Sequence, residues 1–95
     1  MSKTFINGGS VDKITVGSIM DGISVIKLRV TGMNKTKHAE VSLEIQINAE
    51  DGHKEVIFKQ FEISRHKDNC TGFLEFTLPY NVKSVKILKG EVKKL

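Results

Sequence analysis

The sequence predicts an all-β domain, built as a single antiparallel β-sandwich of about six to seven short strands. The first observation is the strict alternation over residues 41–47. Aliphatic side chains share one face there, and Ser42, Glu44 and Gln46 share the other. The second is a series of turn signals at spacings of roughly 8–12 residues. The third is that no long stretch repeats with the helical period. Together these patterns are typical of a small sandwich, and a small barrel stays open as the alternative.

The first hairpin is expected from residues 11–19 and 23–31, joined by a tight Asp-Gly turn. The apolar residues of 11–19 do not alternate strictly, which predicts a β-bulge near Gly17. The preceding residues 1–10 contain an Asn-Gly-Gly-Ser run and are expected to form a flexible N-terminal arm. The domain proper is therefore predicted to span residues 11–95.

The second hairpin is expected from residues 39–48 and 54–63, around another Asp-Gly turn. In 54–63 the apolar residues change parity, which predicts a bulge or a strand that crosses between two sheets. Residues 72–78 and 82–89 are expected as the last strands. The spacing of Val82, Val85 and Leu88 also fits a helix, but β-branched residues and the lack of a capping residue favour a strand.

The aromatic residues of this 95-residue chain are five Phe and one Tyr, with no Trp. A single domain of this size has room for a small core but little for an enclosed active-site cavity. The Phe residues at 58, 61, 73 and 76 lie among Ile and Leu, so we expect them in the core. Tyr80 is expected to be the free aromatic residue.

Charge is unevenly distributed along the chain, whose formal net charge is +4. Six acidic residues lie between Glu40 and Glu62, whereas five lysines follow Val82 with Glu91 as the one acidic residue among them. A basic segment attracts nucleic acid or anionic surfaces. Lysines on an exposed strand also keep that strand from pairing with other chains, and this second interpretation is favoured.

Cys70 is the only cysteine, so no intrachain disulfide is expected. A single thiol fits a reducing compartment. The N-terminus has no apolar run typical of a signal peptide, and no stretch has the length and hydropathy to span a membrane. We therefore expect a cytoplasmic protein without membrane contact, while an exported origin stays open.

Three segments suggest a family. Val30-Thr-Gly-Met-Asn34 runs from a strand into a loop, Asp51-Gly52 forms a turn, and Gly72-Phe-Leu-Glu-Phe-Thr-Leu-Pro79 forms a late strand. This order resembles the small immunoglobulin-like and fibronectin-III-like sandwich domains, in particular those of the FxLYD type. The resemblance covers about the last two-thirds of the chain. The sequence departs from the family pattern at Gln46-Ile-Asn48. The resemblance implies an immunoglobulin-like fold and a non-catalytic binding or accessory role, and it supplies no functional residues.

Catalytic and metal-binding chemistry has weak support in the sequence. The histidines at 38, 53 and 66 all fall in expected loops. His66 and Cys70 have a tolerable spacing for two metal ligands, and the same pair could activate a thiolate. No second ligand pair and no orienting third group accompany them. We expect no catalytic residue, no metal, no cofactor and no enzymatic activity.

The sequence therefore predicts a non-catalytic protein-binding module, such as an assembly subunit or a phage-type inhibitor. It would act through the loops 32–38 and 64–71, expected to lie near each other, or through an edge strand that also permits a homodimer. The alternative is a single-stranded nucleic-acid-binding small β-barrel that uses the basic C-terminal strand. That alternative is disfavoured because Tyr80 is the one aromatic residue expected to be free, so the sequence predicts no platform for base stacking. The candidate partner-binding residues are Asn34, Lys35, Lys37, Arg65, His66, Lys67, Lys83 and Lys86.

Overall fold

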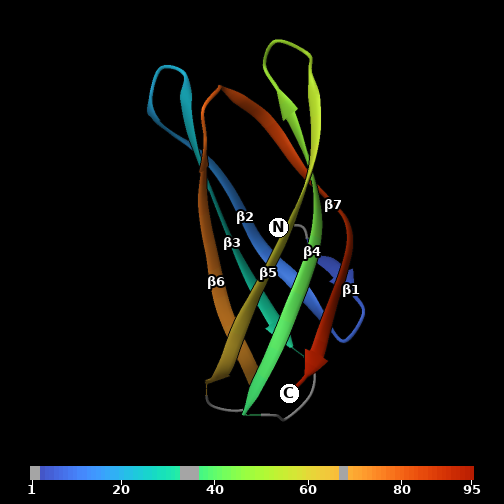
Figure 1. Ribbon diagram of the computed structural model, residues 1–95. Helices are drawn as coiled ribbons and strands as arrows, with labels where there is room; N and C mark the ends of the chain where they lie inside the picture. Colours follow the sequence, from blue (N-terminus) through green and yellow to red (C-terminus); the bar gives the residue numbers. More distant parts are fainter. Residues whose placement is uncertain (1–2, 33–36, 67–68) are drawn as a thin grey trace.

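The computed structural model describes residues 3–32, 37–66 and 69–95, and every regular element in these ranges is a β-strand (Figure 1). This part of the chain contains no helix that is long and apolar enough to cross a membrane. The strands are β1 (Thr4–Ile6), β2 (Gly9–Met20), β3 (Ile23–Gly32), β4 (His38–Ala49), β5 (Lys54–His66), β6 (Asn69–Leu78) and β7 (Val82–Lys94).

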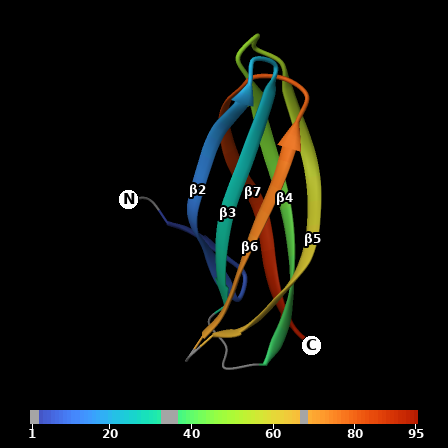
Figure 2. The same ribbon diagram turned by 90° about the vertical axis from the view of Figure 1, so that its left-hand side faces the viewer.

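The strands form one antiparallel sheet in the order β1-β2-β3-β6-β5-β4-β7. The sheet curls until its two end strands meet: Asn7 N–H donates to the Gly90 carbonyl at 3.1 Å, and Val92 N–H donates to the Asn7 carbonyl at 2.7 Å. Figure 2 shows β2, β3 and β6 side by side across the front, with β4 and β7 behind. The all-β prediction is confirmed. The expected immunoglobulin-like sandwich is corrected to a nearly closed, barrel-like sheet.

Two narrow junctions close this barrel-like sheet. Between β5 and β6, the described residues pair only over Ser64–His66 with Asn69–Thr71. Gly72 follows at once, and a Cβ atom there would lie 2.5 Å from Ile63 Cγ2. Gly90 lies at the other junction, where a Cβ atom would lie 2.7 Å from Ile6 Cγ2. Both glycines therefore allow strands of the two halves to approach more closely than an alanine would permit.

Both N-terminal hairpins turn through two residues. Met20 pairs with Ile23 across Asp21-Gly22, as predicted, and Gly22 has φ of 85°. Ile6 pairs with Gly9 across Asn7-Gly8, where Gly8 also has φ of 85°. Such conformations are readily adopted by glycine, and Asn-Gly is a favoured hairpin pair. Within the segment expected as a flexible arm, β1 and the start of β2 are thus ordered as strands.

The interior of the barrel is lined mainly by β3 and β4. The inward residues of β4 alternate without interruption, which confirms the prediction from residues 41–47. The largest fully buried side chains are Ile26, Leu28, Leu43, Ile45, Ile47, Ile63, Val11, Val30, Val41 and Cys70. The fully buried core is therefore aliphatic, and of the phenylalanines expected there Phe61 and Phe76 pack against it, partly buried.

Strand β5 differs from its prediction. Its pairing with β4 runs from His38–Ser64 to Asn48–Lys54 without a register shift, so the expected bulge or sheet crossing is wrong. The mixed parity arises because apolar residues lie on both faces of a regular strand. Phe58 points outward, while Lys59 shares the inner face and places its Nζ 4.8 Å from the centre of the Phe76 ring.

The expected polar loop 64–71 is largely strand, because β5 continues to His66 and β6 begins at Asn69. The expected last strand is confirmed, and it extends to Lys94. In Figure 1 the β2–β3 and β4–β5 hairpins lie at the end opposite the β5–β6 junction. Candidate surfaces are therefore the two broad outer faces and the two ends of the barrel.

Candidate functional site

The first candidate surface is the outer face of β2, β3 and β6. Lys13, Arg29 and Phe73 form one cross-strand row. Phe73 is 73% exposed, although it was expected in the core. A surface hollow of about 200 Å³ lies among these side chains. We define the Phe73 face as Lys3, Asp12, Lys13, Thr15, Lys27, Arg29, Phe73 and Glu75, all outward residues of this part of the sheet or side chains paired with them.

A β-bulge at Asp12 organises this face. Val11 pairs with Val30 and Lys13 pairs with Arg29, which follow each other on β3, so the described pairing leaves Asp12 unopposed. The sequence predicted a bulge near Gly17, and the pairing of β2 with β3 does shift register close by, between Ser18 and Met20. The bulge at Asp12 was not predicted. A bulge redirects the side chain of its extra residue, and here the Asp12 side chain is only 8% exposed.

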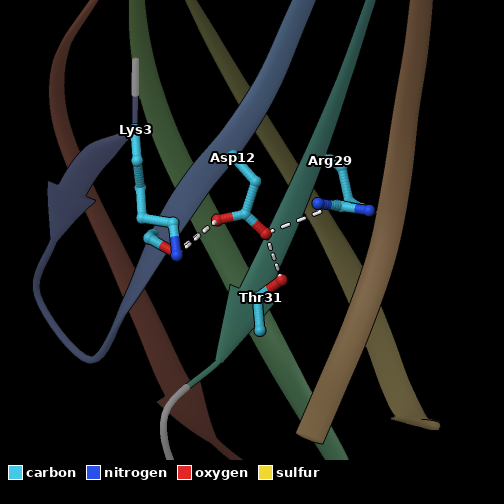
Figure 3. Close-up of polar contacts among 5 residues, drawn as sticks. Lys3, Asp12, Arg29 and Thr31 are labelled. Carbon is cyan, nitrogen blue, oxygen red and sulfur yellow. Dashed lines mark hydrogen bonds and ion pairs between the residues drawn. The ribbon is translucent and has the colours of Figure 1, made fainter. Parts of the chain in front are cut away.

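The Asp12 carboxylate has polar contacts with four side chains (Figure 3). Ser10 Oγ donates to it at 2.7 Å, and Thr31 Oγ1 donates a second, short hydrogen bond. Arg29 Nε lies 3.4 Å from one carboxylate oxygen, and Lys3 Nζ lies 3.8 Å from the other. The cluster joins β2, β3 and Lys3, the residue before β1, and it holds Arg29 on the outer surface beside Phe73.

The pKa of Asp12 lies below its ordinary value. Burial raises the pKa, but the hydrogen bonds from Thr31 and Ser10 and the positive charges of Lys3 and Arg29 lower it by more. Asp12 is therefore an anion at neutral pH, and its charge is neutralised within the face. The remaining cations, Lys13 and Lys27, are exposed.

The second candidate surface is the outer face of β5, β4 and β7. Phe58 is 71% exposed midway along β5, in a row with Glu44 and Lys89. It borders a hollow of about 410 Å³ lined by Asn7, Ser42, Glu44, Phe58, Lys89, Gly90 and Glu91. We define the Phe58 face as Glu40, Glu44, Lys54, Val56, Phe58, Glu62, Lys86, Lys89, Glu91 and Lys93.

Charge is graded along the Phe58 face. Lys54 and Lys86 lie toward the β4–β5 hairpin, whereas Glu40 and Glu62 are paired near the opposite end. Glu91 also lies toward that end, and Lys93 beside Glu40 is the exception. Cations and acids are equal in number over the described face, so the surface has polarity without net charge.

The predicted loop residues are only partly brought together. Arg65 N–H donates to the Lys37 carbonyl at 2.9 Å, which confirms that the two segments meet. Asn34, Lys35 and Lys67 lie outside the described residues, as does the side chain of His66. Lys83 and Lys86 are exposed on β7 but lie toward the opposite end, near the β4–β5 hairpin. The structure thus separates the predicted residues into two groups.

Cys70 is buried to 1% exposure on β6, so its thiol faces the core. In the described ranges no group of three or more His, Cys, Asp or Glu residues could hold a metal ion.

Tyr80, expected to be a free aromatic residue, contacts two side chains at the end of the barrel that carries the β4–β5 hairpin. Its hydroxyl donates to the Glu55 carboxylate, and its ring centre lies 4.9 Å from that of His53. Burial, together with the bond to Glu55 and its charge, raises the pKa of Tyr80 to about 12. Next to this pair, the pKa of Asp51 is lowered, first by the hydrogen bond from the His53 backbone N–H. Tyr80 is therefore not available for base stacking.

Sequence reasoning missed the exposure of Phe58 and Phe73. For Phe73 a signal was present, because Leu74, Phe76 and Leu78 were assigned to the inner face and Phe73 has the opposite parity. For Phe58 the signal was ambiguous, since Val56, Ile57 and Phe58 place apolar side chains on both faces. No family model, curated protein or solved structure matches this chain, so the resemblance to FxLYD-type domains stays a prediction.

Proposed function

We propose that the protein is a non-catalytic protein-binding subunit that assembles through the Phe58 face. The observation that supports this proposal is the 71% exposure of Phe58 midway along β5, on the outer surface that β5 forms with β4 and β7. Val56 extends the apolar area along β5. Exposed aromatic residues surrounded by polar residues are typical of protein interfaces, where they contribute most of the binding energy.

The charge gradient supports a second copy of this chain as the partner that we propose. A twofold axis that crosses the strands at Phe58 would invert the rows of the facing copy. Lys54 would then face Glu62, Lys86 would face Glu91, and the two Phe58 rings would meet at the axis. Since a twofold axis repeats each pair, the arrangement gives four opposite-charge pairs. Glu44 and Lys89, which share the row of Phe58, would each face their own copy.

Light scattering coupled to size-exclusion chromatography tests this assembly over a range of protein concentrations. We expect the wild-type chain to move from monomer to dimer as the concentration rises. Phe58→Ser should stay monomeric, because it removes the central apolar contact. Phe73→Ser removes an equally exposed ring from the other face, so it should dimerise like the wild type.

Charge-reversal variants test the proposed charge pairs directly. The Lys54→Glu/Lys86→Glu variant and the Glu62→Lys/Glu91→Lys variant should each fail to dimerise alone. Mixed together, they should form a heterodimer, because each of these four facing pairs is then acidic on one chain and basic on the other. A wild-type chain that stays monomeric throughout, or dimers that tolerate Phe58→Ser, would show that the proposed assembly is wrong.

A further inference from the structure

The Phe73 face has a different charge balance from the Phe58 face. Among its described residues four are cationic, namely Lys3, Lys13, Lys27 and Arg29, and two are acidic. One of the acids, Asp12, is nearly buried and already neutralised by Lys3 and Arg29. What a ligand meets on this face is therefore an excess of positive charge around an exposed aromatic ring.

We propose that the Phe73 face binds single-stranded nucleic acid. Unpaired bases stack on exposed aromatic side chains without regard to sequence, and cations beside the ring contact the phosphates. Phe73 supplies such a ring at 73% exposure. A duplex keeps its bases stacked inside, so it offers the ring little to contact.

Arg29 is held in position for this role. It pairs directly with Phe73 across β3 and β6, so their Cβ atoms are about 5 Å apart. Asp12 contacts the guanidinium through Nε, which is buried, while the Arg29 side chain remains 40% exposed. The terminal amino groups of the guanidinium are thus left for a phosphate or a base edge.

Lys13 and Lys27 extend the positive surface beyond Arg29. Lys13 continues the Phe73–Arg29 row onto β2, and Lys27 lies in the next row beside Thr15. With strands about 4.8 Å apart, the row is about 10 Å wide. Glu75, opposite Lys27, is the exposed acid at the border of this surface.

The basic C-terminal strand fits nucleic acid less well than the sequence suggested. On β7, Lys89 and Lys93 are paired across the sheet with Glu44 and Glu40, and Glu91 lies between them. A polyanion would meet alternating charges there. We therefore assign the proposed nucleic-acid surface to β2, β3 and β6 rather than to β7.

Fluorescence anisotropy with labelled oligothymidine and oligouridine about 15 nucleotides long tests the proposal, and the two arms distinguish DNA from RNA. At low salt the wild type should bind at least one of them. Phe73→Ala should weaken binding roughly ten- to hundredfold, whereas Phe73→Tyr should retain it. Phe58→Ala should leave binding unchanged, which separates this surface from the proposed assembly face.

A charge-matched pair isolates the role of the lysines. Lys13→Gln/Lys27→Gln and Lys86→Gln/Lys89→Gln remove the same charge from opposite faces. The first should weaken binding and reduce the slope of log affinity against log salt by about 1.4, given about 0.7 per phosphate contact. The second should leave that slope nearly unchanged.

Three results would overturn the proposal. The first is no binding to either oligonucleotide at low salt. The second is equal affinity for heparin or for a duplex of the same length, which would show simple attraction to polyanions. The third is equal loss in the two lysine variants. Thermal unfolding of each variant checks that the fold is intact.

Discussion

The two outer faces carry the same kind of central residue in different electrostatic surroundings. Phe73 lies midway along β6 and Phe58 midway along β5, and the two rings are almost equally exposed. Around Phe73 the cations outnumber the acids, and a nearly buried carboxylate holds Arg29. Around Phe58 the charges are balanced and graded along the strands. The difference teaches that the arrangement of charge around an exposed ring, rather than the ring itself, indicates the class of partner.

The polar network around Asp12 is more buried than the polar contacts of the Phe58 face. We expect this difference to give the largest effect of a substitution on stability. Asp12→Ala should reduce the free energy of unfolding by about 3 kcal/mol, because it removes the acceptor of the Ser10 and Thr31 hydroxyls and the carboxylate that faces Arg29. On the Phe58 face, Glu40→Ala should cost under about 0.5 kcal/mol, since its hydrogen bond with Gln60 is exposed.

Urea unfolding measures both values, and Asp12→Asn serves as the nearly isosteric control. Asn keeps the volume but loses the charge, so its cost should fall between those of the two alanine variants. Equal stability of the Asp12→Ala and Glu40→Ala variants would remove the distinction between a buried and an exposed network.

The next largest effect is expected in the dependence of folding stability on pH below neutrality. The pKa of Asp12 is lower in the folded chain than its unfolded value of about 4, so the ionised carboxylate stabilises the fold above that pH. This contribution should be lost as the pH falls through the folded pKa. Unfolding measured from pH 6 to pH 2, a range of about two units on either side of that value, should show a shallower acid slope for Asp12→Asn than for Glu40→Gln.

The smallest expected effect concerns the titration of Tyr80, which lies at the end of the barrel that carries the β4–β5 hairpin. Its folded pKa of about 12 exceeds the unfolded value of about 10, so its stabilising contribution is present below pH 10 and is lost as the pH rises toward 12. Since the chain has one Tyr and no Trp, an absorbance titration reports this group alone.

Glu55→Gln should lower the titration midpoint of Tyr80, because it removes a negative charge next to the phenol. The shift should be partial, since burial is the largest cause of the raised pKa. Glu75→Gln, on the Phe73 face, should leave the midpoint where it is. A Glu55→Gln midpoint identical to that of the wild type would contradict the role of this contact.

Local alternation and turn chemistry predicted much of the fold. The seven residues from Val41 to Ile47 form a strand with one buried face, and the Asp-Gly pairs turn as expected. Closure of the barrel was not predictable in the same way. It depends on Asn7 meeting Gly90 and Val92, a contact between distant segments in a stretch that resembled a flexible arm.

The candidate surfaces were harder to predict because they depend on pairing across strands. The position of the bulge at Asp12 is defined by Val30 and Arg29 on the neighbouring strand, not by residues near it in sequence. The outward direction of Phe58 becomes clear only when β5 is registered against β4, since Glu55 and Lys59 are polar residues on its inner side. Phe73 could have been assigned by parity alone.

The short β5–β6 junction makes the barrel unequal in its resistance to opening. Within the described residues, three residue pairs join β5 to β6, whereas eleven join β5 to β4. Local opening free energies follow the number of backbone hydrogen bonds and buried contacts that must break. Amide hydrogens along β5 that point toward β6 are therefore expected to exchange with solvent before those that point toward β4. The two faces are thus joined along a seam where the sheet opens first.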